Sequence, residues 1–108
     1  MPPDLSFLPD DLKAVAVFTT NKEEVMWARH HVERVIAEVA DSGHVVLGLD
    51  LRSDGLGFTP PGLATEVPWS IYDGEADPAA ARDAALAALR RRDIESFDEY
   101  RWVLVTWR

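Results

Sequence analysis

The clearest hydrophobic pattern lies in residues 21–43, where apolar side chains recur at intervals of three and four. This spacing places them on one face of a helix. Asn21 is a typical residue to precede a helix, and Glu24 completes a capping box with it. Gly43 favours the left-handed backbone that ends many helices. We therefore expect a helix from Asn21 to Gly43, and its buried stripe is Val25, Ala28, Val32, Val35, Ile36 and Val39.

A second helix is predicted where alanine dominates the sequence, over residues 78–92. Asp77 suits the position before a helix, and Pro78 suits its first turn. Alanine is the best helix former, and small side chains allow close packing on a sheet. Residues 93–100 are expected to form a connector. The buried stripe of this helix is Ala81, Ala85, Ala88 and Leu89, with Leu86 beside it.

Four other stretches favour strands: residues 13–19, 44–52, 65–72 and 101–107. The second alternates apolar and polar positions, which predicts one buried and one open face. Its buried side chains would be Val45, Leu47, Leu49 and Leu51. The glycines and prolines of residues 53–62 predict a loop between the second and third strands, which would form a hairpin.

The resulting order is β-α-β-β-α-β, which predicts an α+β protein of ferredoxin-like type. Right-handed connections would place both helices on one face of a four-stranded antiparallel sheet, giving a two-layer sandwich. The length of 108 residues suits one domain over residues 1–108. Residues 1–12, rich in proline and aspartate, are expected to be a lead-in segment.

The charge is strongly negative, with a net value of −8. Residues 1–81 contain 14 acidic and 5 basic residues, whereas residues 82–108 are nearly balanced. An acidic surface repels nucleic acid and anionic membranes and attracts basic partners. Solubility alone is the plainer explanation of such acidity. The first residues show neither a signal peptide nor a membrane span, so we expect a cytoplasmic protein with no nucleic-acid or membrane partner.

No motif in the sequence specifies a reaction. The chain has no cysteine, which excludes disulfides and thiolate chemistry. His30 and His31 are adjacent, whereas helical zinc motifs need ligands four residues apart. The glycine-rich loop lacks the lysine of a phosphate-binding loop and precedes a strand. We therefore expect no enzyme, no cofactor, no metal and no catalytic residue.

The aromatic and acidic side chains are the candidates for binding a partner. Trp102 and Trp107 differ by an odd number, so in a strand they face opposite sides and one looks away from the helices. Trp27 lies off the stripe of the first helix and is expected to be exposed. Exposed tryptophan often anchors interfaces. The expected partner-binding residues are Trp27, Trp102, Phe58, Asp50, Glu66, Asp73 and Glu75.

The C-terminal half resembles bacterial polymorphic-toxin immunity proteins. The residues that carry the resemblance run from Val67-Pro68-Trp69-Ser70-Ile71 through the alanine-rich helix to the strand from Trp102 to Arg108. Such families have no catalytic residues. The resemblance implies a protein that binds one cognate toxin domain and blocks its active site, and an acidic surface would suit a basic nuclease-type toxin.

Two other hypotheses stay open at this point. One is a small-molecule-binding or regulatory ferredoxin-like domain that dimerises through its open sheet, with a pocket holding His30, His31 or Arg52. The other is an enzyme of dimeric αβ-barrel type, which would need a polar pocket with a titratable group of shifted pKa. The sequence leaves both a monomer and a homodimer open.

Overall fold

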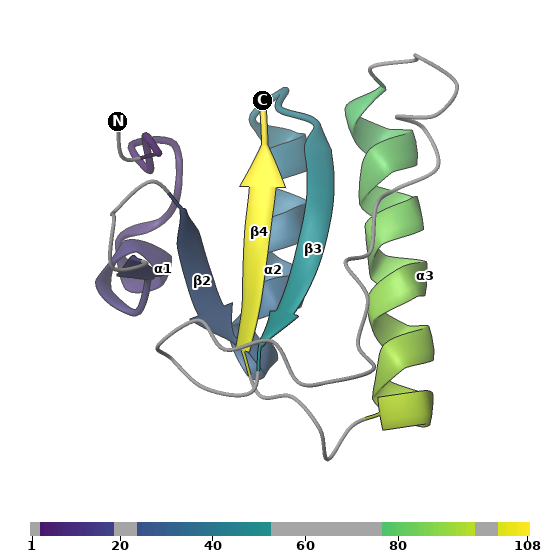
Figure 1. Cartoon of the computed structure of the whole chain (residues 1–108). Coiled ribbons are helices and arrows are strands. Elements are labelled where there is room, and N and C mark those ends of the chain that lie inside the picture. Colours follow the sequence, from purple (N-terminus) through teal and green to yellow (C-terminus); the bar gives the residue numbers. More distant parts are fainter. Residues whose placement is uncertain (1–2, 19–23, 53–76, 97–101) are drawn as a thin grey trace.

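The computed structural model describes residues 3–18, 24–52, 77–96 and 102–108 (Figure 1). The predicted loop at 53–62 and the predicted strand at 65–72 lie outside these residues. The elements in chain order are α1 (Asp10–Ala14), β1 (Val17–Phe18), β2 (Val25–Ala28), α2 (Arg29–Asp41), β3 (Val46–Arg52), α3 (Pro78–Ser96) and β4 (Trp102–Trp107).

The four strands form one antiparallel sheet in the order β1-β2-β4-β3. β4 lies between β2 and β3 and pairs with both, so β2 and β3 run parallel to each other on either side of it. α2 connects these two parallel strands. The unit β2-α2-β3 is therefore a split βαβ motif whose central strand comes from the end of the described chain.

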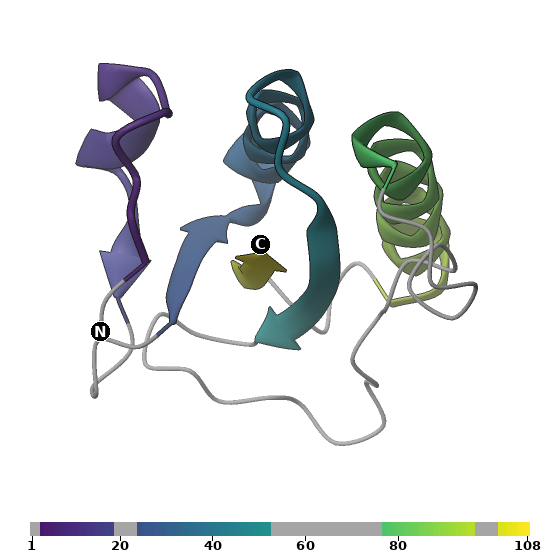
Figure 2. The same cartoon turned by 90° about the horizontal axis from the view of Figure 1, so that it is seen from above.

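The helices stand in a row on one side of the sheet (Figure 2). α2 contacts β2, β3 and β4, while α3 packs against α2 and β3. The core fills the space between these layers and includes Val32, Ile36, Leu49 and Val103. No described helix is long and apolar enough to cross a membrane.

The α+β class and the four-stranded antiparallel sheet are confirmed. The ferredoxin-like order and the two-helix count are not: the described residues contain three helices, and the last strand takes the place between β2 and β3. The long-range pairing of β4 decides this order. Nothing in the local hydrophobic pattern specifies which strand occupies the centre of a sheet.

The prediction for residues 13–28 is wrong in two places. Lys13 belongs to α1, and among the described residues of the predicted strand 13–19 only Val17 and Phe18 are in a strand. Asn21, the predicted start of the next helix, lies outside the described residues. Val25–Ala28, predicted to be helical, is a strand, and α2 begins at Arg29 without a side-chain cap. The run from Val25 to Trp27 is apolar on consecutive positions, which suits a strand covered on both faces. Pairing with β4 selects that conformation over the helical spacing.

The rest of the first predicted helix is confirmed. Its buried residues are Val32, Val35, Ile36 and Val39, which are fully covered. Gly43 follows the helix with a φ of 82°, in the left-handed region that glycine adopts at little cost. Its amide N–H donates to the carbonyl oxygen of Ala40 over 3.0 Å. The helix therefore ends where the sequence predicts.

β3 departs from the strict alternation expected of residues 44–52. Its register against β4 shifts between Val46 and Gly48, which is the signature of a β-bulge. Beyond the shift Leu49 and Leu51 face the core as predicted. Before it Val46 joins the core, while Leu47 is only partly covered. The predicted inward position of Leu47 is therefore wrong, because the bulge reverses the alternation.

α3 begins as predicted and continues further than predicted. The carboxylate of Asp77 accepts a hydrogen bond of 3.0 Å from the amide of Ala79, which caps the helix. Ala81, Ala85 and Leu89 are fully buried. The helix extends to Ser96 through part of the predicted connector. No glycine or proline interrupts residues 93–96, so the helix has no local signal to end at residue 92.

The predicted lead-in segment is an integral part of the core. Leu12 of α1 is fully buried, and Leu8 is 3% exposed. On the surface Arg34 of α2 pairs with Asp11 of α1, with an Nη1 to Oδ2 distance of 2.6 Å and an Nη2 to Oδ1 distance of 3.5 Å. Residues 3–14 therefore attach to the rest of the domain through buried apolar side chains and a bidentate ion pair with α2.

The Asp11–Arg34 pair should make stability depend on pH. The hydrogen bond from Arg34 lowers the pKa of Asp11 below its ordinary value. A lowered folded-state pKa contributes stability above the unfolded-state pKa, and this contribution disappears as pH falls through the folded-state pKa. We expect Asp11→Asn to lower the urea midpoint at neutral pH. The two proteins should converge in acid, and salt should reduce the difference at neutral pH. An equal difference at both pH values would contradict this role.

Candidate functional site

Two of the expected partner-binding residues lie on the same face of the sheet. Side chains alternate along strands, and Leu49, Leu51 and Val103 point to the helices. Asp50 and Trp102 therefore point to the opposite side, which we call the outer face. Asp50 pairs with Leu104, and Trp102 is two residues from Leu104 on β4. Asp50 and Trp102 are thus diagonal neighbours on adjacent strands, roughly 7–8 Å apart at Cα.

The outer face has an apolar centre with partly accessible residues beside it. Met26 and Leu104 are cross-strand partners on this face, and they are 0% and 1% exposed. Asp50 and Trp102 are both half-buried. Trp107 belongs to the other face, where it packs against the core. The expectation that the two tryptophans of β4 face opposite sides is therefore confirmed.

Trp27 does not belong to a partner-binding surface. Its side chain is fully buried, and its indole Nε1 donates a hydrogen bond of 2.9 Å to the carbonyl oxygen of Leu12. Its ring also lies 6.3 Å from the ring of Trp107. The expectation of exposure is wrong because it placed Trp27 on a helix. In β2 the residue points into the core instead.

The remaining expected contact residues, Phe58, Glu66, Asp73 and Glu75, lie outside the described residues. The net charge of the segment that contains these four residues follows from the sequence. Residues 53–76 contain four acidic residues and no basic residue. This segment therefore holds half of the net charge of −8.

α2 does not form a strongly acidic surface, because bases accompany its acids. Glu33 lies 3.5 Å from Arg29 and 3.8 Å from Arg90 of α3. Arg34 pairs with Asp11, as described above. These pairs are solvent-exposed and individually weak, but they balance the local charge. A strongly acidic contact would have to come from elsewhere in the chain.

His30 and His31 lie at the start of α2 with ring centroids 3.9 Å apart. Burial is the largest cause of a lowered pKa at His31, and the nearby charges of His30 and Arg34 act in the same direction. Among the described residues there is no group of three or more side chains suited to hold a metal ion. The arrangement therefore fits two polar histidines on the surface of the first turn of α2.

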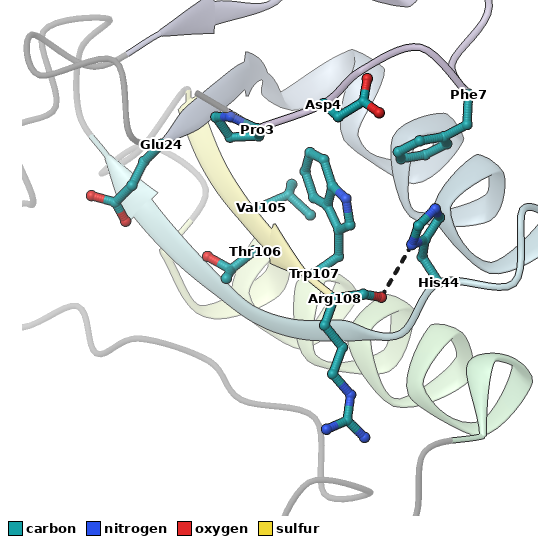
Figure 3. A pocket seen from close by; sticks show the side chains of 9 residues that line it. All are labelled: Pro3, Asp4, Phe7, Glu24, His44, Val105, Thr106, Trp107 and Arg108. Atoms are coloured by element: carbon teal, nitrogen blue, oxygen red, sulfur yellow. Dashed lines mark hydrogen bonds between the residues drawn. The ribbon is translucent and has the colours of Figure 1, made fainter. Parts of the chain in front are cut away.

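A second feature, missed by sequence reasoning, is a cavity of about 370 Å³ at the end of β4 (Figure 3). It is built by segments that are far apart in the sequence. No local motif could have revealed it, because only the fold brings these segments together. Its lining residues are Pro3, Asp4, Phe7, Glu24, His44, Val105, Thr106, Trp107 and Arg108.

Aromatic rings and a carboxylate dominate one side of this cavity. The rings of Phe7 and Trp107 meet edge to face at 85°, with centroids 5.7 Å apart. His44 lies 4.6 Å from Phe7, and its Nδ1 is 3.2 Å from the carbonyl oxygen of Arg108. Hydrogen bonds from Ser6 are the main cause that lowers the pKa of Asp4, and the charge of His44 adds to it. Asp4 therefore presents a negative charge at neutral pH.

Comparisons of the chain with protein-family models, with curated proteins and with solved structures gave no match. The described structure defines the class: an α+β domain with three helices on one side of a four-stranded antiparallel sheet. It carries two candidate sites, the outer face and the cavity at the end of β4.

Proposed function

We propose that the protein is an immunity-type inhibitor, which binds and neutralises a cognate bacterial toxin domain through the outer face of its sheet. The observation that carries this proposal is the placement of Asp50 and Trp102 together on that face, beside the buried pair Met26 and Leu104. The proposal includes a cytoplasmic location and no catalytic activity of its own.

The chemistry of the outer face suits a protein partner. A half-buried tryptophan can bury its remaining surface against a partner at small entropic cost, which is typical of interface anchors. The neighbouring carboxylate of Asp50 adds charge selectivity to this contact. The resemblance of residues 67–108 to immunity proteins includes the strand that carries Trp102.

The partner that fits best is a basic domain of nuclease type. The net charge of −8 and the base-free segment 53–76 would attract such a domain and accelerate association at low salt. The same charge opposes direct binding to nucleic acid. An inhibitor of this kind would occupy the basic surface on which the toxin holds its substrate.

The test is binding to the toxin domain encoded by the neighbouring gene, measured by calorimetry and by protection of cells that express it. Trp102→Ala should weaken binding by about 30-fold or more, the effect of losing an interface anchor. Asp50→Asn should weaken binding and reduce its dependence on salt. The matched control is Asp41→Asn, which makes the same charge change at an exposed residue of α2, on the other side of the sheet.

Thermal unfolding of each variant separates loss of binding from loss of fold. No binding of the native protein at micromolar concentration, together with no protection of cells, would reject the proposed function. Equal weakening by Asp50→Asn and Asp41→Asn would instead reject the outer face as the contact surface.

A second candidate is a small-molecule-binding or regulatory domain that acts as a dimer. The cavity at the end of β4 is the observation that favours it, since about 370 Å³ is within the range of ligand sites. Neither His30 nor His31 lines that cavity. Light scattering and metabolite-induced stabilisation test this candidate, and a monomer that no small molecule stabilises would reject it.

A further inference from the structure

In the part of the chain that the structure describes, β4 extends past its pairing with β2 and has an unpaired edge beside the cavity. Its pairing with β3 continues to Trp107, whereas its pairing with β2 ends at Leu104. β2 turns away from β4 towards this end of the sheet (Figure 1). The cavity lies at the same end and is lined by Val105, Thr106 and Trp107.

The backbone groups of Trp107 point towards this open edge. Arg108 donates its amide N–H to the carbonyl oxygen of Val45 and accepts from the amide of Val45, both over 3.1 Å. In an antiparallel ladder, successive residues direct their N–H and C=O groups to opposite sides. Those of Trp107 therefore face away from β3, and in the described part of the chain no strand pairs with them there. An exposed edge of this kind can accept an added strand.

The side chains beside this edge favour a cation. Asp4 is charged and exposed, and Glu24 lines the same cavity. The perpendicular rings of Phe7 and Trp107 offer π faces in two directions, which suits a guanidinium or ammonium group. Of the two basic residues that line the cavity, His44 lies beside Phe7, and the side chain of Arg108 points away from Asp4 and Phe7 (Figure 3).

We infer that this notch, defined as the open edge of β4 at Trp107 with the cavity beside it, binds an extended peptide segment that carries a basic side chain. The peptide backbone pairs with Trp107 by strand addition. An arginine or lysine on the face of Trp107 reaches Asp4 and the two rings. This inference is independent of the proposed toxin contact, since the notch is at the end of the sheet and the toxin contact is on its outer face.

The test is an NMR titration of the isotopically labelled protein with a capped pentapeptide of threonine, valine, arginine, valine and threonine. We expect saturable shifts centred on the amides of Thr106 and Trp107 and on the Trp107 indole. The dissociation constant should be about 1 mM or lower, as expected for one short strand with one charge contact. A peptide with citrulline in place of arginine has the same shape without the charge, and it should bind at least about fivefold more weakly.

Variants identify the site. Asp4→Asn should weaken binding of the arginine peptide about as much as the citrulline substitution does, whereas Asp41→Asn should leave it unchanged. Free arginine amide should bind far more weakly than the peptide, because it cannot pair with the strand.

Equal affinity of the arginine and citrulline peptides would overturn the role of the charge. Equal affinity of arginine amide and the peptide would overturn strand addition. Absence of shifts at Trp107, or shifts that depend on protein concentration without peptide, would overturn the notch as a peptide site. None of these outcomes depends on a toxin, so failure here is distinguishable from failure of the proposed function.

Discussion

Trp27→Ala should lower the free energy of unfolding by about 3–5 kcal/mol, the largest effect expected of any single substitution in the described core. Trp27 is fully buried, and it has the largest side chain among the fully buried residues. Its removal leaves a large cavity between α1 and the sheet. It also removes the only indole donor to the carbonyl oxygen of Leu12 among the described residues. Small domains are stable by about 5–15 kcal/mol, so this loss is a large fraction of the total.

Urea unfolding followed by circular dichroism measures this effect. Trp27→Phe is the matched variant, because it keeps an aromatic ring but removes the N–H group. It should cost less, about 1–3 kcal/mol, for the unsatisfied carbonyl and the smaller ring. A loss below about 1 kcal/mol for the alanine variant would show that Trp27 is not buried in β2.

Leu12→Ala is expected to cost about 2–5 kcal/mol, although it lies in a segment that the sequence marks as a lead-in. Leu12 is fully buried in the core cluster with Val25 and Trp27. α1 has five residues, and a helix this short is not stable by itself in water. Packing of Leu12 therefore holds α1 in place, and its loss should also loosen the hydrogen bond to Trp27.

The matched control is Leu5→Ala, the same substitution at a half-buried position of the same segment. It should cost clearly less, because fewer apolar contacts are lost. Tryptophan fluorescence during urea unfolding measures the free energy of unfolding of both variants. Equal and small losses for the two substitutions would indicate that residues 3–14 are only loosely attached to the body.

The outcome for α2 and α3 shows where local pattern is sufficient. The stripe Val32, Val35, Ile36 and Val39 is buried as predicted, since a helix whose apolar residues lie on one face has few ways to pack. Asp77 caps α3, and the last strand forms within one residue of its predicted start. In these places propensity, capping and hydrophobic periodicity all favour the same conformation.

The outcome for residues 25–28 shows where local pattern fails. Val25 and Ala28 match helical spacing, yet they form a strand because β4 provides a partner on which to pair. That partner is more than seventy residues away in the sequence. The bulge in β3 has the same origin, because it adjusts the strand to β4 and so brings Val46 into the core.

The candidate site residues also divide into those that local pattern predicts and those that depend on tertiary contacts. Alternation along β3 was enough to predict that the side chain of Asp50 points to the face opposite Leu49 and Leu51. Alternation along β4 was enough to predict that Trp102 and Trp107 face opposite sides of the sheet. The burial of Trp27 and the cavity beside Trp107 depend on contacts between distant segments, and periodicity carries no information about them. By itself, then, the sequence determined the buried stripes of α2 and α3, the opposite faces of Trp102 and Trp107, the α+β class and the negative charge, because each depends on neighbouring residues or on composition. Only the tertiary structure decided which strand occupies the centre of the sheet, how residues 25–28 fold, and how far β4 extends past its pairing with β2, because these depend on which distant segments pair.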